Sequence, residues 1–169
     1  MTGTCVRTDA NVDGEPFLVN GFTERLTIEG VPAGVGTPAE STLEQNPIEC
    51  GDILYEEDPV PSCVLQIEDS SNVHLKDLFI TGGEGVSIEN SDVTFEWAGE
   101  VTLSRINGVE VRGSTGRTRL FGDNRIHNNC RHGIFVGGGG SLTVAGTTKI
   151  EDNGAFGVTG RDGSSLVFA

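Results

Sequence analysis

LFGDNRIHNNCRHGIFV, residues 120–136, decides the fold of this chain, because a related stretch begins 24 residues further on. That stretch, VAGTTKIEDNGAFGVTG at residues 144–160, aligns with the first without a gap. Apolar, Asn and Gly residues occupy matching positions in the two copies, namely Ile126 and Ile150, Asn129 and Asn153, and Gly133 and Gly157. A constant period of this length indicates a repeat architecture.

Each unit contains short segments of alternating apolar and polar residues, separated by Gly, Asn and Asp, which favour turns. No unit contains apolar residues at helical spacing over the length of a helix. One unit cannot bury its apolar side chains alone, but stacked units share a continuous core. Leucine-rich repeats have a similar period, but their Leu-rich frame is absent here. Units of 21 to 25 residues therefore predict one turn of a parallel β-solenoid each, with Asn129 and Asn153 in turns where stacked Asn side chains bond backbone groups.

The recurring pattern of Gly, alternating apolar residues, Asn with a second Asn or Gly, and then Gly-Ile or Gly-Val resembles the right-handed parallel β-helix repeats of the pectate-lyase-like superfamily. The resemblance covers residues 64–169 well and residues 17–30 weakly. It implies an all-β, right-handed parallel β-helix of roughly five to six turns. It implies little about function, because this fold carries lyases, hydrolases, epimerases, adhesins and non-catalytic stalks.

The length predicts a single domain over residues 1–169. We expect an irregular lead-in at residues 1–16, a loop excursion at residues 31–62 and regular turns over residues 63–169. The chain contains no signal-peptide pattern and no apolar run that could insert into a membrane. The repeat strand at residues 166–169 is followed by no cap, so we expect either a longer natural protein or end-to-end stacking of another subunit on that strand.

The net charge of −14 is unevenly distributed along the chain. Residues 1–100 contain 20 Asp or Glu against 3 Lys or Arg, whereas residues 101–169 contain 5 against 8. A solvated acidic surface is common in secreted proteins, and the alternative is an acidic region for cations beside a basic region for a polyanion. The overall acidity argues against nucleic acid as a general partner.

Four cysteines are present, Cys5, Cys50, Cys63 and Cys130. Cys50 and Cys63 bracket a short segment with prolines and an acidic run, and we predict a disulfide between them. The pairing of Cys5 and Cys130 stays open, because they lie far apart in the predicted stack. An even cysteine count permits disulfides, and we expect an extracellular or cell-surface location.

Equal positions in successive turns stack, roughly 4.8 Å apart, so the outward positions place Glu68, Glu89 and Glu110 near Arg112 on one face. Carboxylates at this spacing repel one another, and a bound Ca²⁺ ion would relieve the repulsion. The resemblance implies a role for the cluster. In calcium-dependent polysaccharide lyases of this fold the metal neutralises a uronate carboxylate and a basic side chain removes a proton, which makes Arg112 the candidate catalytic residue. The alternative is a set of solvent-facing charges that pair with each other.

A second group of cations lies in the C-terminal half, and comprises Arg125, Lys149, Arg131 and His132. The period places Glu100, Arg125 and Lys149 in one ladder, and Thr102, His127 and Glu151 in another. We predict a groove for acidic polysaccharide or a cell-surface glycan. The alternative is ion pairing along the stack, such as Arg125 with Glu100, which contributes little when exposed.

Two classes of function follow from these patterns. The first is a non-catalytic extracellular or cell-surface module, either structural or binding acidic glycans. The second is a lyase or epimerase that acts on polyuronates with Ca²⁺, and the question of an enzyme stays open. The few turns and the absence of complete catalytic motifs favour the first class. The segment Arg131-His132-Gly133 resembles the Gly-His-Gly motif of polygalacturonases, but the carboxylate pair required for glycoside hydrolysis is missing from the pattern.

Overall fold

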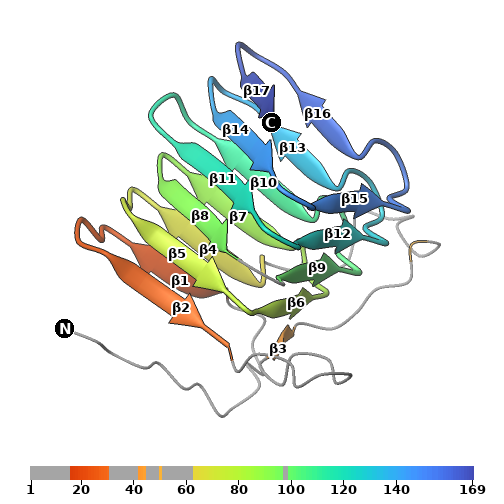
Figure 1. The fold of residues 1–169 in the computed structure, drawn as a ribbon, viewed down its shortest axis with the longest axis horizontal. Helices are drawn as coiled ribbons and strands as arrows, with labels where there is room; N and C mark the ends of the chain where they lie inside the picture. The colour runs from red at the N-terminus through yellow and green to blue at the C-terminus, as the bar shows by residue number, and fades with distance from the viewer. Residues whose placement is uncertain (1–15, 31–41, 45–49, 51–62, 97–98) are drawn as a thin grey trace, which may run out of the picture.

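The computed structural model describes residues 16–30, 42–44, 50, 63–96 and 99–169. In these residues the chain is all-β and contains no helix, and therefore no helix long and apolar enough to cross a membrane. The strands form three parallel sheets, and each sheet receives every third strand along the chain (Figure 1). The fold is a parallel β-solenoid, as the sequence period predicts.

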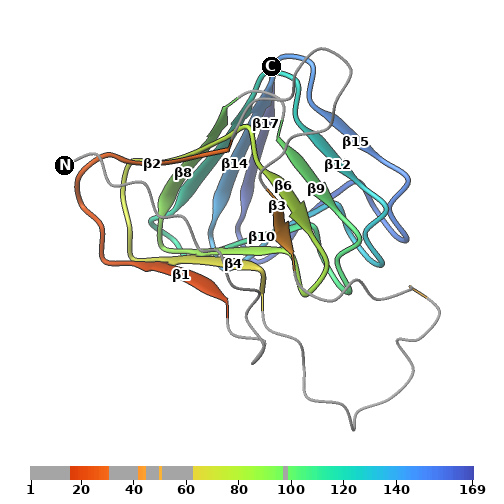
Figure 2. The same cartoon turned by 90° about the horizontal axis from the view of Figure 1, so that it is seen from below.

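The first sheet, sheet A, consists of β1 (Phe17–Asn20), β4 (Leu65–Glu68), β7 (Val86–Glu89), β10 (Val109–Arg112), β13 (Ile134–Val136) and β16 (Val158–Gly160). Sheet B consists of β2 (Leu26–Glu29), β5 (Val73–Lys76), β8 (Asp92–Glu96), β11 (Arg117–Phe121), β14 (Ser141–Ala145) and β17 (Ser165–Phe168). Sheet C consists of β3 (Thr42–Glu44), β6 (Phe79–Thr81), β9 (Glu100–Thr102), β12 (Arg125–His127) and β15 (Lys149–Glu151). Figure 2, turned by a right angle, shows the three sheets on three sides of the core.

Four turns from β4 to β15 are complete, each with one strand in every sheet. The turn of β1, β2 and β3 contains residues outside the described ranges, and β16 and β17 contribute to sheets A and B alone. The predicted number of five to six turns is therefore slightly too high for complete turns. The predicted lead-in and most of the predicted excursion lie outside the described residues, but residues 42–44 of the excursion pair with β6 as β3.

The register of sheet A confirms the period. Leu65 pairs with Val86, Val86 with Val109, Val109 with Ile134, and Ile134 with Val158. Spacings of 21, 23, 25 and 24 residues are thus absorbed in the turns, and the strands stay aligned. Any two residues one period apart are consequently neighbours on adjacent strands, which is what positions the candidate site.

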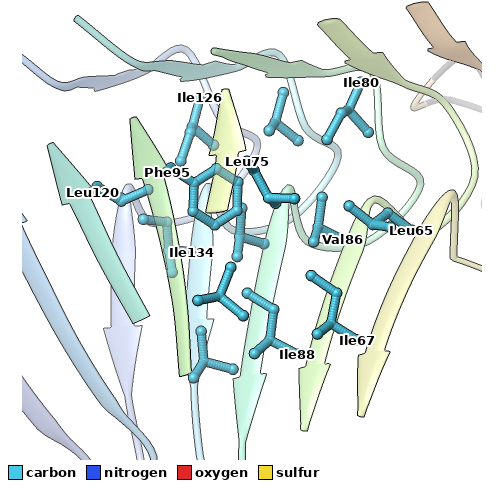
Figure 3. Close-up of a cluster of buried hydrophobic side chains, with 14 of the residues drawn as sticks. Leu65, Ile67, Leu75, Ile80, Val86, Ile88, Phe95, Leu120, Ile126 and Ile134 are labelled. Atoms are coloured by element: carbon cyan, nitrogen blue, oxygen red, sulfur yellow. The ribbon is translucent and has the colours of Figure 1, made fainter. Parts of the chain in front are cut away.

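The core consists of the inward-facing residues of the three sheets. Alternation along each strand sends successive side chains to opposite faces, so β4 buries Leu65 and Ile67 and turns Gln66 and Glu68 outward. Figure 3 shows aliphatic side chains from neighbouring turns packed together in the interior. Each fully buried Leu or Ile contributes about 1.5–3 kcal/mol relative to an exposed one. Fully buried examples are Leu65, Ile67, Ile80, Ile88, Leu120, Ile126 and Ile134.

The turns are joined by polar ladders that satisfy backbone groups. The Asn129 side chain accepts from the Ser104 backbone N–H at 3.1 Å and donates to Asn153 Oδ1 at 2.9 Å. A Ser ladder does the same between sheets A and B, where the Ser70 backbone N–H donates to Ser91 Oγ at 3.0 Å. The predicted turn role of Asn129 and Asn153 is therefore confirmed.

Candidate functional site

Sheet A carries the residues that the sequence suggested for metal binding. Glu68 and Glu89 are register partners, as are Glu89 and Arg112, so the predicted outward ladder exists. The carboxylates have different partners, however: Glu110 accepts from Arg112 Nε, and Glu68 accepts from the side chains of Gln66 and Asn20. Among the described residues, no group of three or more His, Cys, Asp or Glu side chains could hold a metal ion. The three glutamates share a face but not a common point, and Ca²⁺ binding stays a prediction without support from this arrangement.

Arg112, the candidate catalytic residue, is in contact with two neighbouring side chains. Its Nε donates to Glu110, and its guanidinium carbon lies 5.8 Å from the centroid of the Phe135 ring. A carboxylate partner and an aromatic face both stabilise a cation. A side chain that removes a proton must be in its deprotonated form, and an arginine keeps its proton in proteins. These contacts therefore give no support to the role of a base for Arg112.

Arg125 and Lys149 lie next to each other on sheet C, because they are register partners on β12 and β15. The predicted ladders are confirmed, but the ion pairs cross between them. Arg125 Nε lies 3.0 Å from Glu151 Oε1, while Glu100 is bound by His127 Nε2 at 2.5 Å. The Arg125–Glu151 pair is about half exposed and contributes little to stability. Cations and carboxylates thus alternate on this face.

His132 lies in the turn between β12 and β13 and is only 5% exposed, so it is not open to a ligand as the sequence suggested. Its ring is stacked with two phenylalanine rings. The centroid distance is 6.2 Å to Phe135 with planes at 26°, and 5.7 Å to Phe156 with planes at 8°. We call His132, Phe135 and Phe156 the aromatic stack. The stack bridges two turns, because His132 and Phe156 are one period apart.

The aromatic stack is surrounded by polar and cationic groups. The Phe156 backbone N–H donates to His132 Nδ1 at 3.4 Å, and Thr159 Oγ1 lies 3.4 Å from the same nitrogen. The pKa of His132 is lowered from its usual range, first by burial and then by the positive charges of Arg131 and Arg161. These charges act on His132 from two different turns. The charges of two exposed guanidinium groups therefore reach the aromatic stack.

Sequence reasoning did not single out Phe135, Phe156 or Arg161 for binding. A signal existed for Phe135, because the same outward position holds Gln66, Ser87 and Glu110 in earlier turns. An aromatic residue among polar ones at a solvent-facing position indicates either a partner or a stacking role. The position of Phe156, one period after His132, could also have been derived from the repeat.

The disulfide prediction is wrong. Cys50 is bonded to Cys130, with Cα atoms 5.1 Å apart, and not to Cys63. The prediction relied on the short sequence distance between Cys50 and Cys63. In the structure Cys63 lies just before sheet A, beside Glu84 and Ser87, whereas Cys130 lies in the turn after β12. Burial, with the Glu84 carboxylate nearby, raises the pKa of Cys63 to about 11. The fourth cysteine, Cys5, lies outside the described residues.

Fold and surface together define a parallel β-solenoid with an aromatic stack and flanking arginines on its C-terminal turns. Comparisons with known protein families, with curated proteins and with solved structures find no match. The likeness to the pectate-lyase-like superfamily therefore stays a prediction, while the β-solenoid architecture stands on the structure itself.

The pKa of His132 predicts a specific acid sensitivity. In the unfolded chain a histidine has a pKa near 6.5, and in the folded protein the pKa of His132 is lower. Below about pH 6.5 the unfolded state therefore binds more protons than the folded state, and the free energy of unfolding falls. His132→Phe keeps an aromatic ring in the stack but cannot bind a proton. We expect urea denaturation between about pH 7 and about pH 5 to show a shallower decline for the variant, by at most about 1.4 kcal/mol per pH unit. His74 and His127 are present in both proteins, so equal declines would contradict the prediction.

Proposed function

We propose that this protein is a non-catalytic extracellular or cell-surface β-solenoid module that binds an acidic polysaccharide on its C-terminal turns. The observation that supports this proposal is the position of Arg131 and Arg161, whose charges both act on His132 in a protein of net charge −14. Exposed guanidinium groups can bind carboxylates or sulfates through charge-assisted hydrogen bonds.

The charge distribution favours an acidic glycan over nucleic acid. Nucleic-acid binding depends on neutralising many closely spaced phosphates, and a strongly acidic protein repels such a polymer. Double-stranded nucleic acid carries one charge per about 1.7 Å of helix axis. A uronate polymer carries at most one charge per pyranose and otherwise presents hydroxyl groups and neutral rings. A small cationic surface on an acidic protein is suited to that lower charge density.

The surroundings of the basic residues favour binding over catalysis. Proton abstraction by an Arg or His side chain requires its deprotonated form in contact with the ligand. Arg112 is paired with Glu110, and His132 is more than nine-tenths buried within the aromatic stack. Neither group presents a free base to a bound sugar, which supports a module that holds its ligand without changing it.

The proposal is tested by calorimetric titration with polygalacturonate, alginate and hyaluronan, each with Ca²⁺ and with a chelator, and with a neutral polysaccharide as reference. We expect one of the acidic polymers to bind, and the double variant Arg131→Ala, Arg161→Ala to bind about tenfold more weakly or worse. The double variant Arg117→Ala, Arg119→Ala, which removes two positive charges from β11 of sheet B, is the matched control and should bind as the unaltered protein does. Arg125→Ala and Lys149→Ala measure the contribution of sheet C.

Three results would contradict the proposal. The unaltered protein could bind none of the acidic polymers. Alternatively, the control variant Arg117→Ala, Arg119→Ala could weaken binding as much as Arg131→Ala, Arg161→Ala does, which would indicate unspecific attraction. Thirdly, the ultraviolet absorbance of unsaturated uronates could rise during incubation. Only β-elimination generates that absorbance, so a rise would establish a lyase.

A further inference from the structure

We infer that the exposed face of the Phe156 ring is a stacking surface for a sugar ring, and that Arg131 and Arg161 contact the anionic group of the same or a neighbouring sugar. The ligand class is an anionic pyranose polymer, and a polyanion without sugar rings lacks the group that Phe156 would recognise. This inference rests on the proposed function and assigns a residue and a binding mode to it.

The exposure of Phe156 is the first argument. Its side chain is 65% exposed, more than any other large hydrophobic residue in the described ranges. One face of the ring is covered, because the His132 ring lies 5.7 Å away and nearly parallel to it at 8°. The exposed area therefore belongs to the opposite face and the edge. A flat apolar surface of this kind fits the apolar face of a pyranose.

The fixed position of the ring is the second argument. The turn that carries Phe156 is bonded to the preceding turn through its backbone. Gly154 donates to the Asn129 carbonyl at 2.8 Å, and the Phe156 carbonyl accepts from Gly133 N–H at 3.0 Å. The Phe156 N–H adds its bond to His132 Nδ1. A ring held in this way loses little conformational freedom when a ligand binds, which favours affinity.

The polar rim is the third argument. Arg131 and Arg161 are near enough to His132 to lower its pKa, and His132 is in direct contact with Phe156. Ligand sites combine apolar or aromatic surface with a few convergent polar groups that fix orientation. Arg131 and Arg161 are both exposed, and their charges reach the His132 ring on which Phe156 is stacked. That combination fits a ligand that is both ring-shaped and anionic.

A second copy of the chain is the other occupant to consider, because Leu166, Val167 and Phe168 of β17 are also exposed at this end. Arg161 lies between β16 and β17 and is exposed, so a two-fold contact through this end would bring positive charge to the interface from both copies. Like charges at such a contact repel. An anionic glycan meets the same surface with favourable charge.

The test compares Phe156→Ala with Phe156→Trp in calorimetric titrations with an oligogalacturonate and, separately, with inorganic polyphosphate, which has no sugar ring. We expect Phe156→Ala to bind the oligogalacturonate about fivefold more weakly or worse, and to bind polyphosphate within about twofold of the unaltered protein. Phe156→Trp should retain oligogalacturonate binding. Phe121→Ala removes another exposed phenylalanine, from sheet B, and should change neither affinity.

The possible failures are distinguishable. If the unaltered protein binds neither this oligosaccharide nor any other acidic glycan, the proposed function and this inference both fall. If it binds the oligogalacturonate and Phe156→Ala binds equally well, the stacking role alone is overturned. An equal loss of polyphosphate binding would show that the substitution disturbs the turn instead of removing a stacking face. If light scattering finds a dimer that Phe156→Ala converts to a monomer, the ring belongs to a subunit interface and the inference is wrong.

Discussion

Replacement of Cys130 by Ser is expected to lower the free energy of unfolding by about 4 kcal/mol. The disulfide joins residues 80 positions apart, so its loss releases a large closed loop in the unfolded chain. In the chain-entropy description, the stabilisation grows with the logarithm of the loop length. A loss of this size is a large fraction of the stability of an ordinary domain, and urea denaturation without reductant would measure it.

Reductant supplies the control for this prediction. Reduction should lower the free energy of unfolding of the unaltered protein to that of Cys130→Ser. The free energy of unfolding of the variant, which lacks this disulfide, should change little. Peptide mapping without reduction should recover a peptide pair that contains Cys50 and Cys130. A peptide pair that joins Cys50 to Cys63 would contradict the structure. A disulfide of this kind persists in an oxidising compartment, which is consistent with the proposed extracellular or cell-surface location.

The fold could be derived from the sequence because the period fixes it. Leu65, Val86, Val109 and Ile134 share one inward position, and the structure aligns them in register although their spacing varies. The variation falls in turns, where an additional residue changes no strand pairing. The inward alternation of apolar residues supplies the same core pattern in every turn, so the architecture is specified many times over.

The candidate site was less accessible to sequence reasoning, because register specifies neighbours but not partners. The period places Arg125 between Glu100 and Lys149. Its guanidinium nevertheless pairs with Glu151, because Glu100 is already bound by His127. The same limit applies to His132. Its position in a basic segment suggested a ligand-binding residue, and only the three-dimensional arrangement shows its ring buried and stacked with the rings of Phe135 and Phe156.

The predicted disulfide between Cys50 and Cys63 was wrong for a different reason. A short segment between two cysteines suggests a local disulfide, and this rule takes no account of stacking, which brings residues far apart in the sequence together. Cys50 reaches the turn that carries Cys130, several turns along the stack from β3. Contacts made by long connections carry no periodic signal, so neither the repeat nor the sequence distance could identify them.

Substitution of Gly133 by Ala is expected to lower the free energy of unfolding by about 3 kcal/mol. A Cβ atom at this position would lie 2.5 Å from Ile150 Cγ2 and 2.7 Å from the Gly157 carbonyl oxygen. The carbonyl cannot move freely, because it accepts the Ile134 backbone N–H at 2.8 Å and so holds two turns together. The Ala side chain therefore forces the last turns apart. Thermal and urea denaturation would measure the loss.

Gly157→Ala is the matched control, because Gly157 occupies the same position one period later. Its nearest neighbours would lie 3.4 Å from an added Cβ, which is ordinary van der Waals contact, and neither glycine has a positive φ. Replacement of Gly by Ala at a permitted conformation restricts the unfolded chain and stabilises by about 0.4–1 kcal/mol. The same substitution should thus have opposite signs at two equivalent positions. If Gly133→Ala and Gly157→Ala changed the free energy of unfolding equally, the prediction would be wrong. Glycine would then be required at this position by its backbone conformation and not by the close approach of successive turns.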